Sequence, residues 1–146
     1  MQKSSKKAFT MIELIFVIVV IGILSAIAVP KFAATRDDAQ VTKGLATLAS
    51  VRSALATERQ KQILKGDFDG ITNLRGTGSG VFTKFNDVNG SLVLEYDVKS
   101  CTDRVGCWST NDGETYTFKS PSGDCTFKLE NNRFNDVTSG GCTDMN

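Results

Sequence analysis

The feature that most constrains this chain is an apolar run near its start that contains a single acidic residue. Residues 9–29 read FTMIELIFVIVVIGILSAIAV, and Glu13 is the only charged side chain among them. As a helix, this run would span roughly 31 Å, about the thickness of the hydrocarbon core of a bilayer. Lys6 and Lys7 precede it and favour a cytoplasmic start. The run therefore predicts a membrane-spanning helix in which the carboxylate of Glu13 requires an explanation.

The helical pattern continues beyond the apolar run. Pro30 follows the run, and a proline can bend a helix without ending it. Further along, one apolar stripe at helical spacing is formed by Val41, Leu45, Leu48, Val51 and Leu55. Gly66 suits a C-terminal cap. We expect one helix from Phe9 to about Leu64, apolar all round over residues 9–30 and amphipathic over residues 31–65.

After Gly66 the sequence changes to loops and β-patterned runs. Residues 66–80 contain five glycines and predict a loop. Short β-patterned runs follow at 81–85, 91–98, 115–119 and 125–130, and the last two are joined by SPSGD, a plausible hairpin turn. Residues 131–146 look irregular. The expected fold class is α+β: a long N-terminal helix whose C-terminal half packs on a small antiparallel sheet within residues 66–146.

Composition and charge exclude several functions. The chain contains no histidine, which excludes histidine-based catalytic triads, histidine general bases and histidine-containing zinc sites. Residues 31–65 carry a net charge of +4, whereas residues 66–146 carry −5. An acidic C-terminal part argues against direct binding of nucleic acid. The glycine-rich GTGSG at 76–80 lacks the lysine of a phosphate-binding loop. We therefore expect a protein that is not an enzyme.

Four cysteines, at positions 101, 107, 125 and 142, all lie in the C-terminal part of the chain. None of them forms a C-x-x-C pair, so neither a zinc ribbon nor a thioredoxin-type site fits. An even number of cysteines beyond a membrane-targeting segment predicts two disulfides made in an oxidising compartment, with buried free thiols as the alternative. Sequence alone permits three pairings.

The N-terminal segment allows two processing schemes. Ala26-Ile27-Ala28 matches the small-x-small site of an ordinary secretory signal, which would leave a secreted or anchored binding domain starting at Val29. Glu13 and the continuous helical pattern argue against this scheme. In contrast, KKAFTMIEL followed by an apolar run and a proline resembles the start of type IV pilins and of type II secretion pseudopilins. The resemblance covers roughly residues 6–32.

The resemblance implies how the N-terminus is processed. In that family a membrane peptidase cuts ahead of the apolar run and the new first residue is methylated. Here the cut would fall between Ala8 and Phe9, so that residues 1–8 are a leader peptide and Phe9 carries the methyl group. Ala8 departs from the family, which usually has glycine at this position. We therefore expect slower cleavage rather than none.

The resemblance also implies a role for Glu13 in assembly. A carboxylate near the membrane interface is tolerable, but in a packed filament it needs a partner, and the amine of Phe9 on a neighbouring subunit can provide one. Two alternatives are the helix dipole and the Phe9 amine of the same chain. Gly22 and Pro30 could let the helix loosen during assembly, or could mark a close helix contact and a simple bend.

Two expectations concern the C-terminal region. Local closure favours Cys101–Cys107 and Cys125–Cys142, and the second bridge would pin the tail, much as pilins pin their C-terminal loop. The acids Asp124, Glu130, Asp136 and Asp144 could bind calcium, as in some pseudopilins, but the EF-hand spacing is absent and a solvated face is the simpler interpretation. We expect no metal or other cofactor.

Taken together, the residues and the resemblance predict a structural subunit of a type IV pilus-like filament. The expected partners are copies of the chain, related pilins, the prepilin peptidase and methyltransferase, and an inner-membrane assembly platform with its ATPase. Before assembly the chain would reside in the inner membrane, with its head, the small sheet domain of residues 66–146, in the periplasm. It would lie in an extracellular pilus or a periplasmic pseudopilus afterwards. A type II secretion or DNA-uptake filament is the alternative use.

Overall fold

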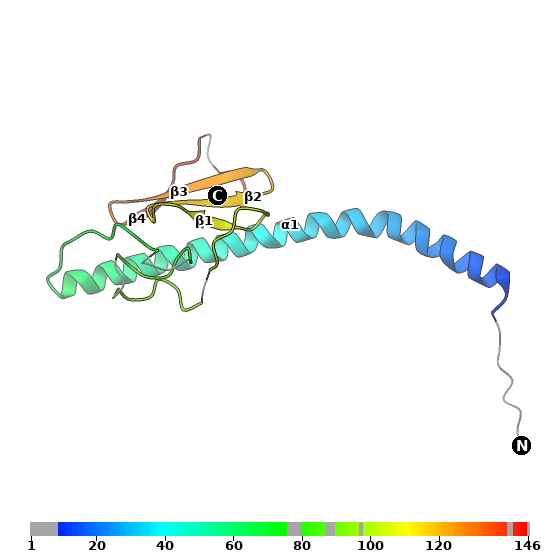
Figure 1. The fold of residues 1–146 in the computed structure, drawn as a ribbon, viewed down its shortest axis with the longest axis horizontal. Coiled ribbons are helices and arrows are strands. Elements are labelled where there is room, and N and C mark those ends of the chain that lie inside the picture. The colour runs from blue at the N-terminus through cyan, green and yellow to red at the C-terminus, as the bar shows by residue number, and fades with distance from the viewer. Residues whose placement is uncertain (1–8, 76–79, 87–89, 97, 140–141, 146) are drawn as a thin grey trace, which may run out of the picture. The chain divides into compact units, whose positions relative to one another are not determined.

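The computed structural model describes residues 9–75, 80–86, 90–96, 98–139 and 142–145, in two compact units. The first unit comprises residues 1–36 and the second comprises residues 37–146. One helix and four strands are described: α1 (Met11–Leu64), β1 (Trp108–Thr110), β2 (Thr115–Ser120), β3 (Gly123–Glu130) and β4 (Arg133–Asp136). Helix α1 passes through both units (Figure 1). The expected α+β class is confirmed.

Helix α1 ends where the sequence predicts. Gly66 has a positive φ of 78°, a conformation that glycine adopts without strain. Its N–H donates to the carbonyl of Ile63 at 3.0 Å, and the N–H of Asp67 donates to the carbonyl of Gln62 at 2.9 Å. These two hydrogen bonds form a Schellman motif, which satisfies carbonyls that the last turn of a helix leaves unpaired. The helix therefore stops because Gly66 caps it.

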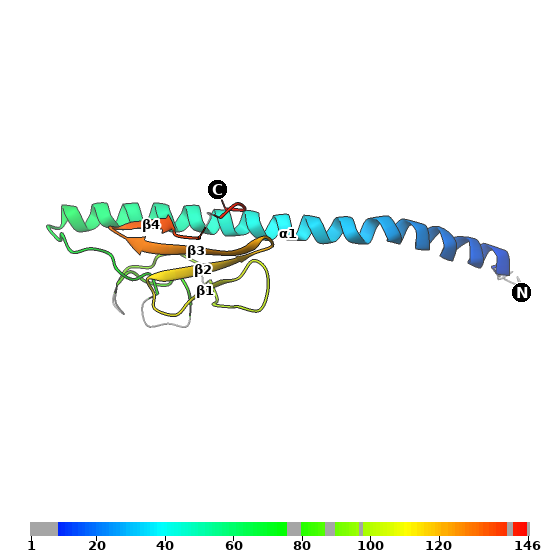
Figure 2. The ribbon, with the colours of Figure 1, turned by 90° about the horizontal axis from the view of Figure 1, so that it is seen from above.

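The second unit contains an antiparallel four-stranded sheet in the order β1-β2-β3-β4. Figures 1 and 2 show this sheet beside the C-terminal part of α1. The SPSGD hairpin is confirmed, because Ser120 pairs with Gly123 across the turn between β2 and β3. The turn between β3 and β4 is formed by Asn131 and Asn132, whose φ angles of 50° and 60° are those of a type I′ hairpin turn.

The hydrophobic core lies between the C-terminal part of α1 and the sheet. Leu48, Val51 and Leu55 are buried on α1 and pack with the inward-facing aromatic residues of the strands. This confirms the apolar stripe, in which Leu45 is partly buried. Phe82 joins the core from a loop, and its ring stacks on Tyr116 with centroids 4.8 Å apart. The remaining aromatic members of this cluster are Phe85, Trp108, Phe118, Phe127 and Phe134.

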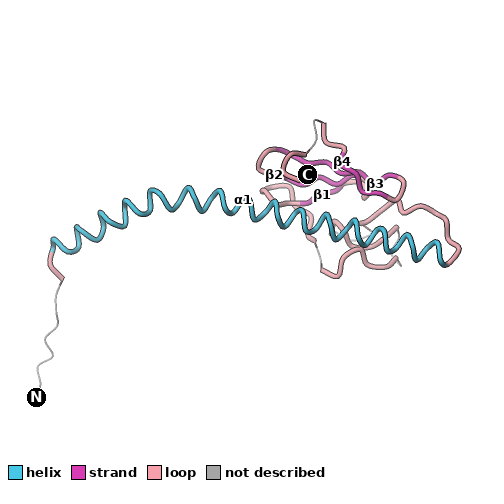
Figure 3. The backbone as a smooth tube through the Cα atoms, turned by 180° about the vertical axis from the view of Figure 1, so that it is seen from behind, coloured by secondary structure: helices cyan, strands magenta, loops and turns pink. Residues whose placement is uncertain are grey.

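Two of the expected strands are wrong. In the described parts of runs 81–85 and 91–98, the one β-bridge joins Lys84 to Leu92, and a further bridge joins Gly80 to Lys99 just outside these runs. In both runs adjacent residues are buried: Val81 with Phe82, and Val93 with Leu94. Successive side chains of a strand point to opposite faces, so a one-sided sheet cannot bury both. The chain instead follows an irregular path here (Figure 3). Both neighbours in each run belong to the core cluster.

Two strands were missed. Strand β4 lies within residues 131–146, which the sequence predicts to be irregular, and β1 is only three residues long. Each of them buries a single large aromatic residue, Phe134 in β4 and Trp108 in β1, so neither shows a clear alternation. The Asn131-Asn132 pair was the available signal for β4, because asparagine tolerates the positive φ that this turn requires.

Candidate assembly and processing segment

Thr10 and Glu13 form a reciprocal cap at the start of α1. The N–H and the hydroxyl of Thr10 donate to Oε2 of Glu13 at 2.9 and 2.8 Å. The N–H of Glu13 in turn donates to Oγ1 of Thr10 at 3.3 Å. The first helical hydrogen bond runs from the N–H of Leu14 to the carbonyl of Thr10. Thr10 is therefore the N-cap residue and Glu13 is the third helical residue of a capping box.

Sequence reasoning missed this cap, although its signature is present. The spacing T-x-x-E ahead of an apolar run predicts a capping box from sequence alone. The contact with Thr10 is local, and it places the Glu13 carboxylate at the N-terminal end of the helix dipole, where a negative charge is stabilised. Ala8 lies outside the described residues, and the neighbouring Phe9 is exposed over 84% of its surface. The pairing of Glu13 with the amine of Phe9 stays a prediction.

The remainder of the apolar run presents large side chains on every side of the helix. Its exposed residues include Phe16, Ile21, Leu24 and Ile27, all more than half exposed. A Cβ atom added at Gly22 would meet nothing within 4 Å in the described structure. Pro30 lies within α1, so it does not end the helix. Among the described residues, α1 alone has the length and apolar composition to cross a membrane, a test that a signal sequence also passes.

Two disulfides join the cysteines of the second unit. Cys101 is bonded to Cys107 and Cys125 is bonded to Cys142, and the Cα atoms of each pair are 5.3 Å apart. The second bridge attaches the C-terminal segment to β3, because Cys125 lies in that strand. Both Cys125 and Cys142 are buried in the core cluster.

Asp136 is a further attachment point of the C-terminal segment. Its Oδ1 accepts hydrogen bonds from the N–H and the hydroxyl of Thr138, and its Oδ2 accepts one from the N–H of Cys142 at 3.0 Å. Partial burial raises the pKa of the Asp136 carboxyl, but these hydrogen bonds and the charge of Arg52 outweigh it. The pKa therefore lies below its usual value of 3.8.

Asp144 holds the same segment to the hairpin between β2 and β3. Its Oδ2 accepts hydrogen bonds from the hydroxyls of Ser120 and Ser122 and from the N–H of Ser122. The hydrogen bond from Ser120, followed by that from Ser122, lowers the pKa of the Asp144 carboxyl.

Among the described residues, the one grouping of three potential metal ligands is Cys101, Asp103 and Cys107, and its two sulfur atoms are joined in the disulfide.

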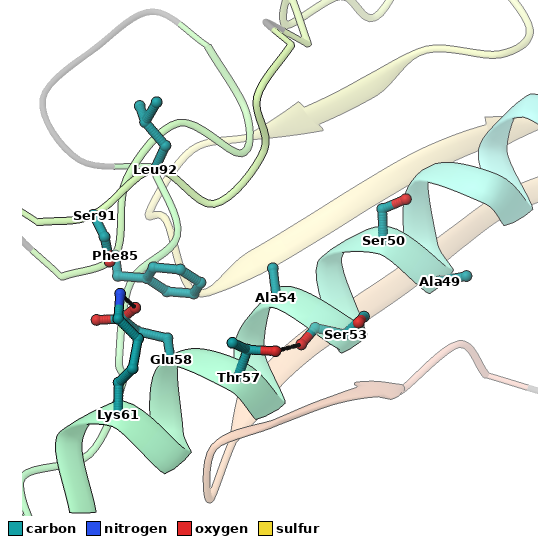
Figure 4. A pocket seen from close by; sticks show the side chains of 10 residues that line it. All are labelled: Ala49, Ser50, Ser53, Ala54, Thr57, Glu58, Lys61, Phe85, Ser91 and Leu92. Atoms are coloured by element: carbon teal, nitrogen blue, oxygen red, sulfur yellow. Dashed lines mark hydrogen bonds and ion pairs between the residues drawn. The ribbon is translucent and has the colours of Figure 1, made fainter. Parts of the chain in front are cut away.

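A groove of about 600 Å³ runs along α1 on the side of the irregular loop (Figure 4). Small side chains form its helical wall, and an ion pair of 3.1 Å joins Glu58 to Lys61 at one end. The other lining residues from α1 are Ala49, Ser50, Ser53, Ala54 and Thr57, and those from the loop are Phe85, Ser91 and Leu92.

Comparisons with known proteins identify relatives of this chain. The family described as "Prokaryotic N-terminal methylation motif" matches residues 3–29. The chain is 58% identical over 50 residues to the type IV narrow pilus major component PilA5 of Thermus thermophilus, which covers 34% of this chain and 43% of that protein. It is 40% identical over 111 residues to a type IV major fimbrial protein FimA of Dichelobacter nodosus, covering 67% of this chain and 66% of that one.

A third relative is the type IV major pilin protein PilE1 of Neisseria gonorrhoeae, with 33% identity over 95 residues, 65% of this chain and 53% of the relative. The chain thus spans at most 66% of the length of these relatives. No solved structure matches. These relatives are named as pilus and fimbrial components rather than enzymes, as the sequence predicts.

The chain has an apolar N-terminal helix with a methylation motif, and a disulfide-bonded antiparallel sheet follows it. Together these features define a pilin-like chain. The matched relatives are named as pilus and fimbrial proteins. The chain belongs to the type IV pilin family.

Proposed function

We propose that the chain is a filament-forming subunit that resides in the inner membrane and polymerises through its N-terminal helix. The observation that carries the proposal is the exposed apolar part of α1 with Glu13 in its first turn. A surface that is apolar on every side suits lipid before assembly and close helix packing after it. The single carboxylate would then fix the register of neighbouring copies, because a buried charge is costly unless it is paired.

Processing is the first step of this proposed function. A membrane peptidase would cut between Ala8 and Phe9, and the new amine of Phe9 would be methylated. This amine would come to lie one helical turn from Glu13 within its own chain, and it could also reach the Glu13 carboxylate of a neighbouring copy. The methylation motif over residues 3–29 supports both the cut and the methyl transfer.

The proposed partners follow from the same steps. They are the peptidase and methyltransferase, further copies of the chain and related pilins, and a membrane platform with an ATPase that extracts the subunits. The head would face the periplasm before assembly and would lie on the outside of the filament afterwards. A surface pilus is our first choice over a secretion or DNA-uptake filament, because the matched relatives carry the names of pilus and fimbrial components.

The test is the mass and N-terminal sequence of the mature chain, expressed with a prepilin peptidase and isolated from membranes. We expect a chain that begins at Phe9 and is one methyl group heavier than its sequence. Ala8→Gly should be processed faster than the natural chain, because glycine is the usual residue at this position in the family that the segment resembles. A mature chain that begins at Val29 would show an ordinary signal peptide and would contradict the proposal.

A further inference from the structure

A second groove, between α1 and β4, combines an apolar floor with two arginines. It has a volume of about 320 Å³, and Leu55, Ala56 and Phe134 line its apolar part. Figure 2 shows β4 running beside α1 here. Arg52 of α1 and Arg133 of β4 also line the groove, and Asn132 and Asn135 complete the lining. At roughly 30 Å³ per water molecule, the groove has room for about ten waters, enough for one aromatic side chain.

In the described part of the chain, neither arginine lies within ion-pair distance of a carboxylate, although the charge of Arg52 also acts on Asp136. Glu130, which faces Arg133 in the sheet, pairs with Lys128 at 2.9 Å instead. Arg52 donates from Nε to the carbonyl of Phe134 at 3.1 Å, which holds its guanidinium at the groove. The groove is therefore an apolar pocket with a positive rim, which suits an aromatic group flanked by carboxylates.

The segment directly after α1 presents such a group. Phe68 is exposed over 72% of its surface and lies between Asp67 and Asp69. The guanidinium of Arg59 donates to the carbonyls of Phe68 at 3.3 Å and of Asp69 at 2.6 Å. Oδ1 of Asp67 accepts the N–H of Asp69 at 3.0 Å. The backbone that carries the exposed ring is thus fixed in advance, which lowers the entropic cost of binding.

We propose that the groove between α1 and β4 receives the Phe68 side chain of a second copy of the chain. Arg52 and Arg133 then face the carboxylates of Asp67 and Asp69 from that copy. A buried aromatic anchor in a pocket is typical of an interface hot spot, and complementary charges favour the correct partner. Because Phe68 is exposed, it does not occupy the groove of its own chain.

This contact joins two different surfaces, so it is head-to-tail. A head-to-tail contact that does not close on itself continues from copy to copy and produces an open helical assembly. The inference rests on the proposed function, and it specifies which parts of the heads meet in the filament. A mutual exchange of Phe68 between two copies would instead produce closed pairs.

The test places a photo-crosslinking phenylalanine analogue, p-benzoylphenylalanine, at position 68 of the full chain and irradiates sheared filaments. We expect a ladder of crosslinked chains beyond the dimer, with crosslinks mapped to residues 52–56 or 132–135 of a different copy. Tyr96, an exposed aromatic residue that also lies between two acids, is the control position and should give no crosslink to that groove. Equal crosslinking to the groove from position 96 would overturn the inference.

The second part of the test reverses the charges on the two sides of the proposed contact. Arg133→Glu should lower the crosslink yield about fivefold, because it sets like charges against each other. Adding Asp69→Arg to that variant should restore most of the yield. Three results would overturn this inference alone, provided that filaments form normally. They are no crosslink from position 68 to the groove, crosslinked dimers without larger products, and no recovery of the crosslink yield in the double variant. A mature chain that forms no filaments at all would overturn the proposed function together with it.

Discussion

At the scale of single residues, glycines in this chain serve two distinct purposes. Gly66 adopts a positive φ that ends α1, whereas Gly44 lies inside the helix, where glycine is about 1 kcal/mol less favourable than alanine. The reason is steric: the ring of Phe118 lies directly against the Gly44 backbone. An isolated glycine within a helical pattern often has a packing reason, so the sequence contains this signal, although it does not name the partner.

Gly44→Ala should destabilise the second compact unit, residues 37–146. The added Cβ would overlap the Phe118 ring, including Cε2 at 2.6 Å. Phe118 is fully buried and packs against Trp108 with ring centroids 5.0 Å apart, so it has no free space to move into. We expect a net loss of about 1–2 kcal/mol, the overpacking cost minus the gain in helix propensity. Thermal unfolding of the full chain in detergent measures this loss.

A double mutant provides the control for this prediction. Phe118→Leu alone should destabilise the head by removing buried apolar contacts. If the clash is the cause, Gly44→Ala should cost much less in the Phe118→Leu background than in the natural chain, because the two sites are coupled. Equal costs in both backgrounds would contradict the steric explanation.

At the scale of elements, the sequence pattern predicted those features that depend on interactions between residues close together in the chain. The helix from about Phe9 to Leu64 and the hairpin at SPSGD were predictable, because caps, apolar spacing and turn residues act over a few positions. The runs at 81–85 and 91–98 were not, because burial in the three-dimensional core decided which of their side chains point inward. The reciprocal bonds of Thr10 and Glu13 were predictable from their spacing and were overlooked.

The groove between α1 and β4 could not have been predicted from sequence. Arg52 and Arg133 are far apart in the chain, and they line one groove because β4 packs beside α1. Strand β4 itself was missed, since Phe134 is its one large buried residue. Long-range juxtapositions of this kind depend on the complete topology of the sheet, and a single sequence does not encode them as a visible pattern.

The C-terminal segment leads to a pH prediction. Because the pKa of Asp136 is lowered in the folded chain, its stabilising contribution is present above its usual value of 3.8 and is lost as the pH falls through the lower folded value. Protonation removes the charge that accepts the N–H groups of Thr138 and Cys142. Thermal unfolding of the full chain should therefore show a loss of stability on acidification below about pH 4.

Asp136→Asn is the matched variant for this pH prediction. An amide oxygen can still accept a hydrogen bond, but it does not titrate in this range. The variant should be less stable than the natural chain at neutral pH, and the difference should shrink as the pH falls. Asp144 also titrates with a lowered pKa, so part of the acid dependence should remain in the variant. A constant difference at all pH values would contradict the assignment to Asp136.

At the scale of the whole molecule, the two compact units have different surfaces. The second unit buries most of its large apolar residues in one core, and two disulfides join its cysteines. The first unit leaves its large apolar residues exposed, and such a continuous apolar surface is typical of a membrane or protein interaction site. The proposed function supplies both environments in succession. In that proposal Glu13 is the charged residue of the apolar run, and its carboxylate is held by the capping contact with Thr10.

The role of Glu13 in assembly can be separated from its role as a cap. Glu13→Gln keeps the capping box, because glutamine serves at this position of the motif as glutamate does, but it removes the charge. We expect the variant to insert and to be cleaved normally, while the yield of sheared filaments falls at least about tenfold, since a buried ion pair is lost. Thr10→Ala is the matched control: it removes the hydroxyl of the cap and keeps the carboxylate, so filaments should form at close to the natural yield. Normal filament yield from Glu13→Gln would show that the carboxylate acts only within its own helix.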